Sequence, residues 1–198
     1  MANWCSTTIR LVGEPEEMKK VYDNMRDALS SNPMKADFDN AWLGNLLLHI
    51  GYTPEQIRNG NGPRCRGSVT DLDLTDNTVC VWTETAWTPM VRCIREFADR
   101  YAQSFKLFFT AEEPGCELFL TNDPDDVGTV VIDNMTDKVV CGVSPYDMEY
   151  VSAEFARGAM SEYLKKDGTF EELAREMLQA GEDVSIHVFE RCDESEVD

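Results

Sequence analysis

The residues best suited to chemistry are three glutamates near the ends of predicted strands. Glu84 lies near the end of one strand, and Glu112 and Glu113 follow another. Paired carboxylates can act as general acid and base or hold Mg²⁺. An antiparallel sheet can bring two strand ends to one edge or separate them. Because no third polar group can be placed beside these glutamates, a solvated surface is the competing interpretation.

Two tryptophans bracket the junction between a predicted strand and the helix that follows it. The stretch Val79–Met90 reads VCVWTETAWTPM, with Trp82 in the strand and Trp87 at the helix entrance. Large rings at such a junction can close one end of the core. They can also wall a recess that receives a ligand. With Glu84 between the tryptophans, a small-ligand or enzymatic site near Trp82, Glu84 and Trp87 is one functional hypothesis.

The cysteines and histidines do not form a recognisable metal or cofactor motif. The cysteines stand at positions 5, 65, 80, 93, 116, 141 and 192. Their number is odd, no C-x-x-C pair is present, and their spacing fits no iron-sulfur cluster. We therefore expect free thiols in a reducing cytosol, with no metal and no cofactor. Cys65, between Arg64 and Arg66, is the one thiol whose neighbours could lower its pKa.

Catalytic and phosphate-binding signatures are also missing from the sequence. It contains no G-x-S-x-G elbow, no G-x-x-x-x-G-K-[ST] loop and no G-x-G-x-x-G after a strand. The loop 122–128 carries Asp123, Asp125 and Asp126 but lacks the late glutamate of a calcium loop. Turn chemistry explains these aspartates more simply. An enzyme is therefore not the favoured class.

Acidity is the most distinctive global property. The 198 residues include 37 acidic and 18 basic side chains, giving a formal net charge of -19. Such a surface repels phosphate backbones and anionic membranes, so we expect no direct nucleic-acid or membrane binding. Because the sequence shows no secretory signal and no apolar run of membrane-spanning length, we expect a cytoplasmic location. Between residues 112 and 149 the only base is Lys138. The acidic residues in that stretch are Glu112, Glu113, Glu117, Asp123, Asp125, Asp126, Asp133, Asp137, Asp147 and Glu149.

The elements that must position these residues follow from hydrophobic periodicity. Alternation predicts strands at 5–12, 69–74, 79–84, 105–111, 116–121, 129–132, 139–143 and 184–189. Helical spacing and capping signals predict helices at 15–30, 89–101, 150–165 and 169–180, with a helical insert at 37–58. The first part has the β-α-β-β-α-β order of ferredoxin-like folds, in which an antiparallel sheet carries both helices on one face.

We therefore expect an α+β protein with a single domain over residues 1–191. Residues 1–111 form a ferredoxin-like split βαβ core with the insert at 37–58. Residues 112–191 extend the same sheet by a β-meander and add two helices. The segment 192–198 is acidic and has no obvious apolar anchor, so it is predicted to be a disordered tail.

Three motifs carry a family resemblance. They are Asn3-Trp4-Cys5 before a strand, the W-x-x-x-A-W-x-P junction that begins at Trp82, and the turn Glu113-Pro114-Gly115. Together they resemble the Api-type ferredoxin-like domain family of phages, conjugative plasmids and gut bacteria, over roughly the first 120 residues. The insert at 42–60 and the run at 116–123 depart from the family pattern. The resemblance implies a fold and a mobile-element setting, without catalytic residues.

The favoured functional hypothesis is a non-enzymatic, acidic protein-binding module of phage or mobile-element type. It would bind a basic host protein through the acidic stretch 112–149 and inhibit a host nucleic-acid-handling or defence system. The same charge also serves solubility, so the acidic surface is open to both interpretations.

Overall fold

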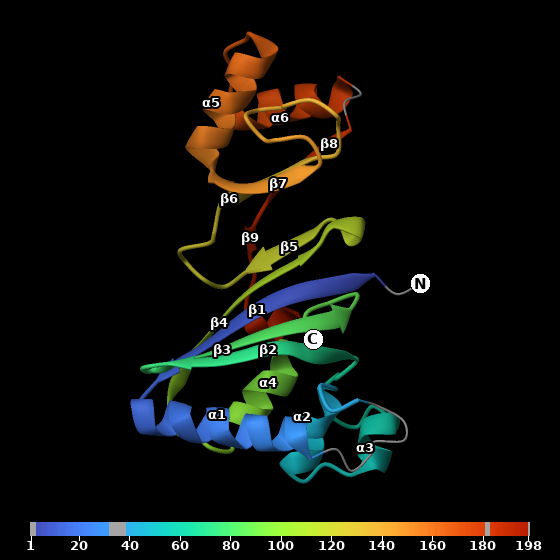
Figure 1. Cartoon of the computed structure of the whole chain (residues 1–198), viewed down its shortest axis with the longest axis vertical. Coiled ribbons are helices and arrows are strands. Elements are labelled where there is room, and N and C mark those ends of the chain that lie inside the picture. Colours follow the sequence, from blue (N-terminus) through green and yellow to red (C-terminus); the bar gives the residue numbers. More distant parts are fainter. Residues whose placement is uncertain (1–2, 32–38, 181–182, 198) are drawn as a thin grey trace. The chain divides into compact units, whose positions relative to one another are not determined.

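The chain forms two compact units. A computed structural model describes residues 3–31, 39–180 and 183–197 (Figure 1). The first unit comprises residues 1–123 and 192–198, and the second comprises residues 124–191. The structure therefore differs from the single domain with one continuous sheet that the sequence predicted, because the second unit has its own sheet and its own hydrophobic core.

The larger sheet has six strands in the order β2-β3-β1-β4-β5-β9. These strands are Trp4–Gly13 (β1), Gly67–Thr75 (β2), Thr78–Ala86 (β3), Phe105–Glu113 (β4), Leu118–Thr121 (β5) and Glu190–Arg191 (β9). β1 pairs antiparallel with β3 and β4, β2 pairs antiparallel with β3, and β4 pairs antiparallel with β5. Together with the helices, this sheet confirms the predicted α+β class.

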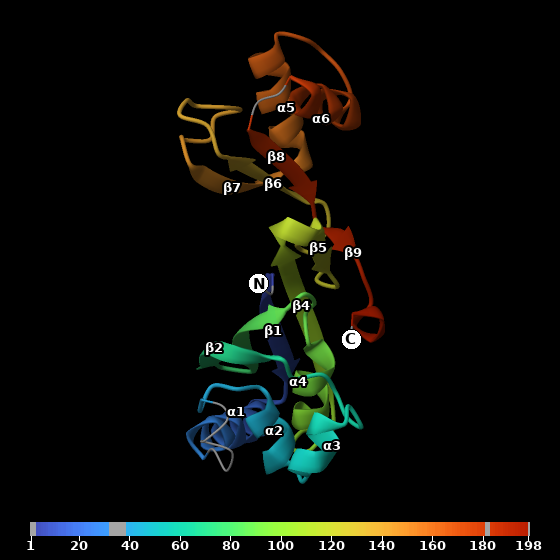
Figure 2. The same cartoon turned by 90° about the vertical axis from the view of Figure 1, so that its right-hand side faces the viewer.

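Helices α1 (Pro15–Ser30) and α4 (Val91–Ala98) pack on one face of this sheet (Figures 1 and 2). α1 begins with Pro15 in its first turn and carries two acidic residues there, which suit the positive end of the helix dipole. The alternation of β1 is confirmed too, because every second side chain is buried. The core joins apolar residues of β1 and both helices, among them Ile9, Leu11, Met18, Val21, Met25, Ile94 and Phe97.

The predicted helical insert forms two short helices, α2 (Gly44–His49) and α3 (Pro54–Arg58). Residues 37 and 38, at the predicted start of the insert, lie outside the described residues. Two backbone hydrogen bonds hold the segment before α2 against the start of β2. The Leu43 N–H donates to the Gly67 carbonyl (3.0 Å), and the Val69 N–H donates to the Ala41 carbonyl (2.8 Å). The insert therefore packs into the core of the first unit.

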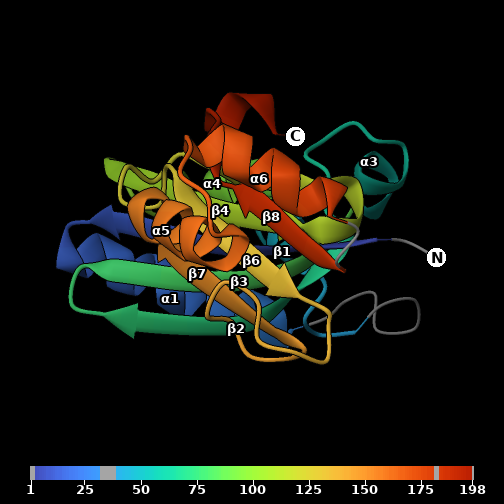
Figure 3. The same ribbon diagram turned by 90° about the horizontal axis from the view of Figure 1, so that it is seen from above.

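The second unit has a three-stranded sheet in the order β7-β6-β8. Its strands are Thr129–Asn134 (β6), Asp147–Ser152 (β7) and Val184–Val188 (β8), and its helices are Ala153–Leu164 (α5) and Phe170–Gln179 (α6). Figures 2 and 3 show α5 and α6 together on one side of this sheet. Their apolar residues form a core with β6 that includes Val130, Ile132, Met160, Leu173 and Met177.

The strand predicted at 139–143 is wrong, because β6 pairs with β7 instead. The buried side chain of Asn134 explains the difference. Its Nδ2 donates to the carbonyls of Lys138, Val143 and Ser144 at 2.9, 3.0 and 2.9 Å. These bonds fold the intervening residues into a loop. The predicted helix start at residue 150 is also three residues too early, since Ser152 caps α5 by accepting from the Phe155 N–H.

The disordered tail predicted at 192–198 is wrong for its described residues, 192–197; Asp198 lies outside them. Glu194–Glu196 forms a 3₁₀ turn (η2), and Glu194 makes an ion pair with Arg95 of α4. The Cys192 N–H donates to the Thr121 carbonyl (2.9 Å). Val197 is only 6% exposed and joins the core of the first unit. This single valine is the apolar anchor that the acidic composition obscured.

Among the helices that the structure describes, none is long and apolar enough to cross a membrane.

If Val197 anchors the C-terminal segment, Val197→Asp should destabilise the first unit by about 1–3 kcal/mol, since it buries a charge in place of an apolar side chain. Urea denaturation followed by tryptophan fluorescence reports on this unit, because all four tryptophans lie between residues 4 and 87. Thr70→Asp, at an exposed residue of the same unit, is the control and should change little. Equal midpoints for both variants would contradict the anchor.

Candidate functional site

The register of β1 places two of the predicted glutamates in one row. Ser6 pairs with Glu84 on β3 and with Glu112 on β4. Two strand spacings, about 10 Å, therefore separate the backbones of the two glutamates, with Ser6 between them. Glu113 alternates to the opposite face and is buried. The three carboxylates thus do not converge.

The Glu113 carboxylate lies at the end of the core of the first unit. Its Oε1 accepts from the Gly115 N–H (3.2 Å), and its Oε2 is buried without a hydrogen-bond partner among the described residues. Burial raises the pKa of the nearby Cys5 thiol to about 11, and the charges of Glu113 and Glu84 add to this increase. A hydrogen bond with Glu113 also raises the pKa of Cys116. The arrangement caps the turn after β4 and keeps both thiols protonated.

The acidic loop residues have separate surroundings. Asp123 is 4% exposed and makes an ion pair with Arg10, whose guanidinium lies over the Phe108 ring. Asp125 and Asp126 belong to the second unit, and Glu117 is exposed in a left-handed conformation. Within the described ranges, the His, Cys, Asp and Glu side chains form no group of three that could hold a metal ion.

The tryptophans of the predicted recess also lie apart. Trp82 is half-buried and pairs with Thr8 of β1, so it belongs to the sheet face opposite α1 and α4. Trp87 lines a pocket that includes neither Trp82 nor Glu84. Of the three residues in the sequence-based ligand hypothesis, only Trp87 therefore contributes to a concave site.

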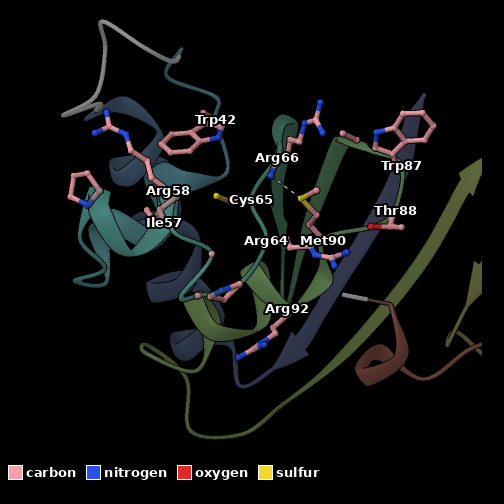
Figure 4. Close-up of a pocket in the computed structure, with 15 residues that line it drawn as sticks. Trp42, Ile57, Arg58, Arg64, Cys65, Arg66, Trp87, Thr88, Met90 and Arg92 are labelled. Carbon is pink, nitrogen blue, oxygen red and sulfur yellow. Dashed lines mark hydrogen bonds between the residues drawn. The ribbon is translucent and has the colours of Figure 1, made fainter. Parts of the chain in front are cut away.

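This pocket, which we call the arginine pocket, has a volume of about 620 Å³ and lies where the insert meets the end of β3 (Figure 4). Four arginines line it, and none of the fifteen described lining residues is acidic. The lining residues are Trp42, Pro54, Ile57, Arg58, Gly60, Gly62, Pro63, Arg64, Cys65, Arg66, Ala86, Trp87, Thr88, Met90 and Arg92.

Close backbone approach brings the two walls of the pocket together. The Ala86 N–H donates to the Arg66 carbonyl (2.9 Å), which continues the β2–β3 pairing into the loop. The Arg66 N–H contacts the Met90 Sδ at 2.8 Å. A Cβ on Gly67 would lie 2.3 Å from the Glu84 carbonyl oxygen, so only glycine permits this approach. Loop 59–66 is thereby fixed against the turn that leads into α4.

Trp87 occupies a strained position at the pocket rim. Its φ of 74° is unusual for a bulky residue and costs on the order of 1–3 kcal/mol. The Trp87 N–H donates to the Asn3 carbonyl (3.0 Å), and the buried Thr85 hydroxyl donates to the Thr88 carbonyl (2.8 Å). These bonds maintain the turn and leave the indole ring 44% exposed. Strained backbone conformations cluster at active sites and ligand-binding sites, and here the strained residue is an exposed tryptophan beside a pocket.

The arginines surround an apolar centre. In Figure 4 the Cys65 sulfur lies between Trp42 and Met90, Arg58 lies beside Trp42, and Arg64 and Arg66 lie on the Met90 side. Arg64 and Arg66 are exposed and have no acidic partner among the described residues. Figure 4 places Arg92 at the other end of the pocket.

Arg92 has a defined partner outside the pocket. Its Nε donates to the Glu96 Oε1 at 3.0 Å, and the Tyr52 hydroxyl donates to the other oxygen of that carboxylate. This chain of bonds joins α4 to the insert. The hydrogen bond to Glu96 raises the pKa of Tyr52. One of the four arginines is thus held in place, whereas Arg64 and Arg66 have exposed guanidinium groups.

Burial, and not the neighbouring arginines, determines the direction of the pKa shift of Cys65. The thiol is 8% exposed, and burial raises its pKa to about 11. The described lining residues provide no carboxylate or imidazole to act as a base. The side chains that the arginine pocket presents are those that bind an anion.

The sequence shows Arg64 and Arg66 on either side of Cys65, but no local pattern assigns them to a binding site. The four arginines come from α3, the following loop and α4, so only the folded structure shows that they line one pocket. The strand-helix junction at Trp87 was the feature that could have pointed to the pocket.

Comparisons of the chain with protein-family models, curated proteins and solved structures give no match.

A pKa near 11 makes a pH-dependent prediction for Cys65. Because the thiolate is the reactive form, alkylation of Cys65 should be slow at pH 7 and should continue to accelerate above pH 9. Mass spectrometry after timed iodoacetamide pulses gives the rate for each cysteine, with the exposed Cys116 as an internal reference. A rate for Cys65 that reaches its plateau below pH 8 would show that the arginines, and not burial, determine its pKa.

Proposed function

We propose that the first unit is a binding module for a small organic anion with a flat or apolar group, and that a nucleoside phosphate is the ligand class that fits best. The observation that carries this proposal is the composition of the arginine pocket. Four of the chain's eleven arginines and two of its four tryptophans line one pocket, with no acidic residue among the described lining residues.

Electrostatics favour an anion at this site. The chain as a whole carries a formal charge of -19, so a local group of four guanidinium ions is a marked departure from its surroundings. Guanidinium groups bind phosphate with two parallel hydrogen bonds, which gives both energy and orientation. Arg64 and Arg66 have no acidic partner among the described residues, and a bound phosphate would provide one.

The apolar part of the pocket favours a flat organic group. The exposed ring of Trp87 provides a stacking surface, and the buried Trp42 and Met90 provide apolar contacts. Stacking of a base on an aromatic side chain is worth about 1–3 kcal/mol. The volume of about 620 Å³ lies within the range of small-molecule sites.

The net charge argues for a small ligand rather than a nucleic-acid strand. A strand extends its phosphates beyond the pocket, where the acidic surface repels them. A mononucleotide places its charge only against the arginines. This ligand class therefore agrees with the expectation that the protein does not bind nucleic acid directly.

We also propose that the first unit has a ferredoxin-like topology and is related to the Api-type family of mobile elements. Support comes from the order β1, α1, β2, β3, α4, β4, with α2 and α3 as an insert, and from the placement of α1 and α4 on one sheet face.

The proposal predicts a defined ligand order and a defined loss on mutation. Calorimetric titration should show that adenosine diphosphate binds more tightly than inorganic phosphate and more tightly than adenosine. In Arg64→Gln/Arg66→Gln the affinity for the nucleotide should fall at least tenfold, because two charged hydrogen-bond donors are removed. Arg100→Gln, at an exposed arginine of the same unit, is the matched control. Equal binding by all three proteins would refute the proposal.

The variant Trp87→Gly distinguishes the contribution of the ligand's flat group to binding from that of its phosphate. Glycine adopts a positive φ without strain, so the variant should fold and should be as stable as the parent or more stable by about 1 kcal/mol. It should lose the preference for nucleotide over phosphate while keeping phosphate binding. If the nucleotide preference survives, Trp87 does not stack on the ligand.

A further inference from the structure

A shallow hollow lies over helix α5 in the second unit. It has a volume of about 680 Å³. Its lining residues are Val139, Cys141, Gly142, Glu154, Phe155, Gly158, Ala159, Glu162 and Tyr163. We call this surface the α5 groove. Val139 and Phe155 are 59% and 58% exposed, so the groove presents large apolar side chains to solvent.

The helix side of the groove has a row of apolar residues and a notch. Phe155, Ala159 and Tyr163 are spaced four residues apart and therefore lie along one face of α5. Apart from the adjoining residues and the backbone of α5 itself, no described atom lies within 4 Å of the position that a Cβ on Gly158 would occupy. A glycine in a helix costs about 0.5–1 kcal/mol relative to alanine. The notch therefore leaves room for a side chain from outside.

The loop side of the groove is held away from the helix. The amide of Asn134 binds three carbonyls of loop 135–146. Cys141 and Gly142 both have positive φ values, 51° and 83°. Val140 and Val143 point into the core, and Val139 is left outside. The hollow is therefore fixed by hydrogen bonds of the loop.

Two carboxylates border the groove along α5. Glu154 and Glu162 are eight residues apart, which is about 12 Å along a helix axis. Both are exposed, and neither makes an ion pair among the described residues. The segment 124–191 holds fifteen acidic and six basic residues, so its surroundings do not neutralise them.

We propose that the α5 groove docks a basic amphipathic helix of a partner protein. An apolar side chain of that helix would enter the notch at Gly158, and Lys or Arg side chains about two turns apart would bind Glu154 and Glu162. Helix-in-groove binding uses apolar anchors at such spacings, and opposite charges at the rim determine orientation and association rate.

The charge of the groove favours this occupant over two others. A second copy of the chain would bring the same glutamates together across a two-fold axis, and like charges repel. An anionic lipid surface would meet the same repulsion. This inference concerns the second unit and does not depend on the ligand of the arginine pocket.

The test uses the full-length protein and two designed, fluorescently labelled helical peptides of 18 residues. One carries a leucine row flanked by lysines eight residues apart, and the other carries glutamates in place of those lysines. Fluorescence anisotropy should show binding of the basic peptide that weakens at least tenfold between low and moderate salt. The acidic peptide should not bind.

Charge reversal of the groove tests specificity. In Glu154→Lys/Glu162→Lys the basic peptide should bind at least tenfold more weakly, and the acidic peptide should now bind. Glu171→Lys/Glu149→Lys removes the same charge elsewhere in the unit and is the control. Glu171, like Glu154, is the second residue of its helix. Equal losses in both double variants would indicate general electrostatic attraction and overturn the proposal.

Gly158→Leu tests the notch separately. Leucine is a better helix former than glycine, so α5 should remain folded while the notch is filled. The basic peptide should bind this variant at least tenfold more weakly than wild type. Undiminished binding, failure of the basic peptide to bind wild type at millimolar concentration, or a stable dimer of the free protein in sedimentation would each overturn the proposal.

Discussion

The first unit depends on the antiparallel pairing of β1 with β3 on one side and β4 on the other. With this register, the apolar residues at every second position of the three strands lie on the sheet face that α1 and α4 cover. It also determines where each strand ends. β3 ends at Ala86, which pairs with Trp4, and the chain then turns at Trp87 beside the start of β2. The arginine pocket is a consequence of that register together with the glycine at position 67.

Charge then distinguishes the two candidate surfaces. Acidic residues outnumber basic ones about twofold in the chain, yet arginines from α3, the following loop and α4 line one pocket of the first unit. The second unit has no comparable group of basic side chains among its described pocket-lining residues, and its groove is bordered by glutamates. A protein with these features can bind a small anion at one site and a basic partner at another. The general acidity keeps each interaction selective by repelling extended anions.

Periodicity and capping predicted most elements of the first unit, because its helices and strands bury one face each. Ile9 and Leu11 on β1, and Ile94 and Phe97 on α4, lie in the core as their spacing indicates. The second unit was predicted less well. The three carbonyl bonds of Asn134 depend on residues up to ten positions away, and no local pattern reveals them.

The site was only partly predictable for a similar reason. Trp87 was identified from its place at a strand-helix junction, whereas its grouping with Arg58 and Arg92 depends on the packing of the insert. Glu84 and Glu112 were correctly placed on strands, but the row through Ser6 that separates them requires the register. Val197 was overlooked because one apolar residue in an acidic segment gives no periodic signal.

We propose that a phosphate-bearing ligand binds the guanidinium groups of the arginine pocket and that its flat part lies against Trp87. Side-chain ¹H–¹⁵N NMR during titration with adenosine diphosphate tests this most directly, since it observes arginine Nε–H and tryptophan Nε1–H groups individually. We expect saturable shifts for Arg64, Arg66 and Trp87, with Trp82 and Arg100 unchanged. Unchanged signals from Arg64 and Arg66, or equal shifts at Trp82 and Arg100, would contradict it.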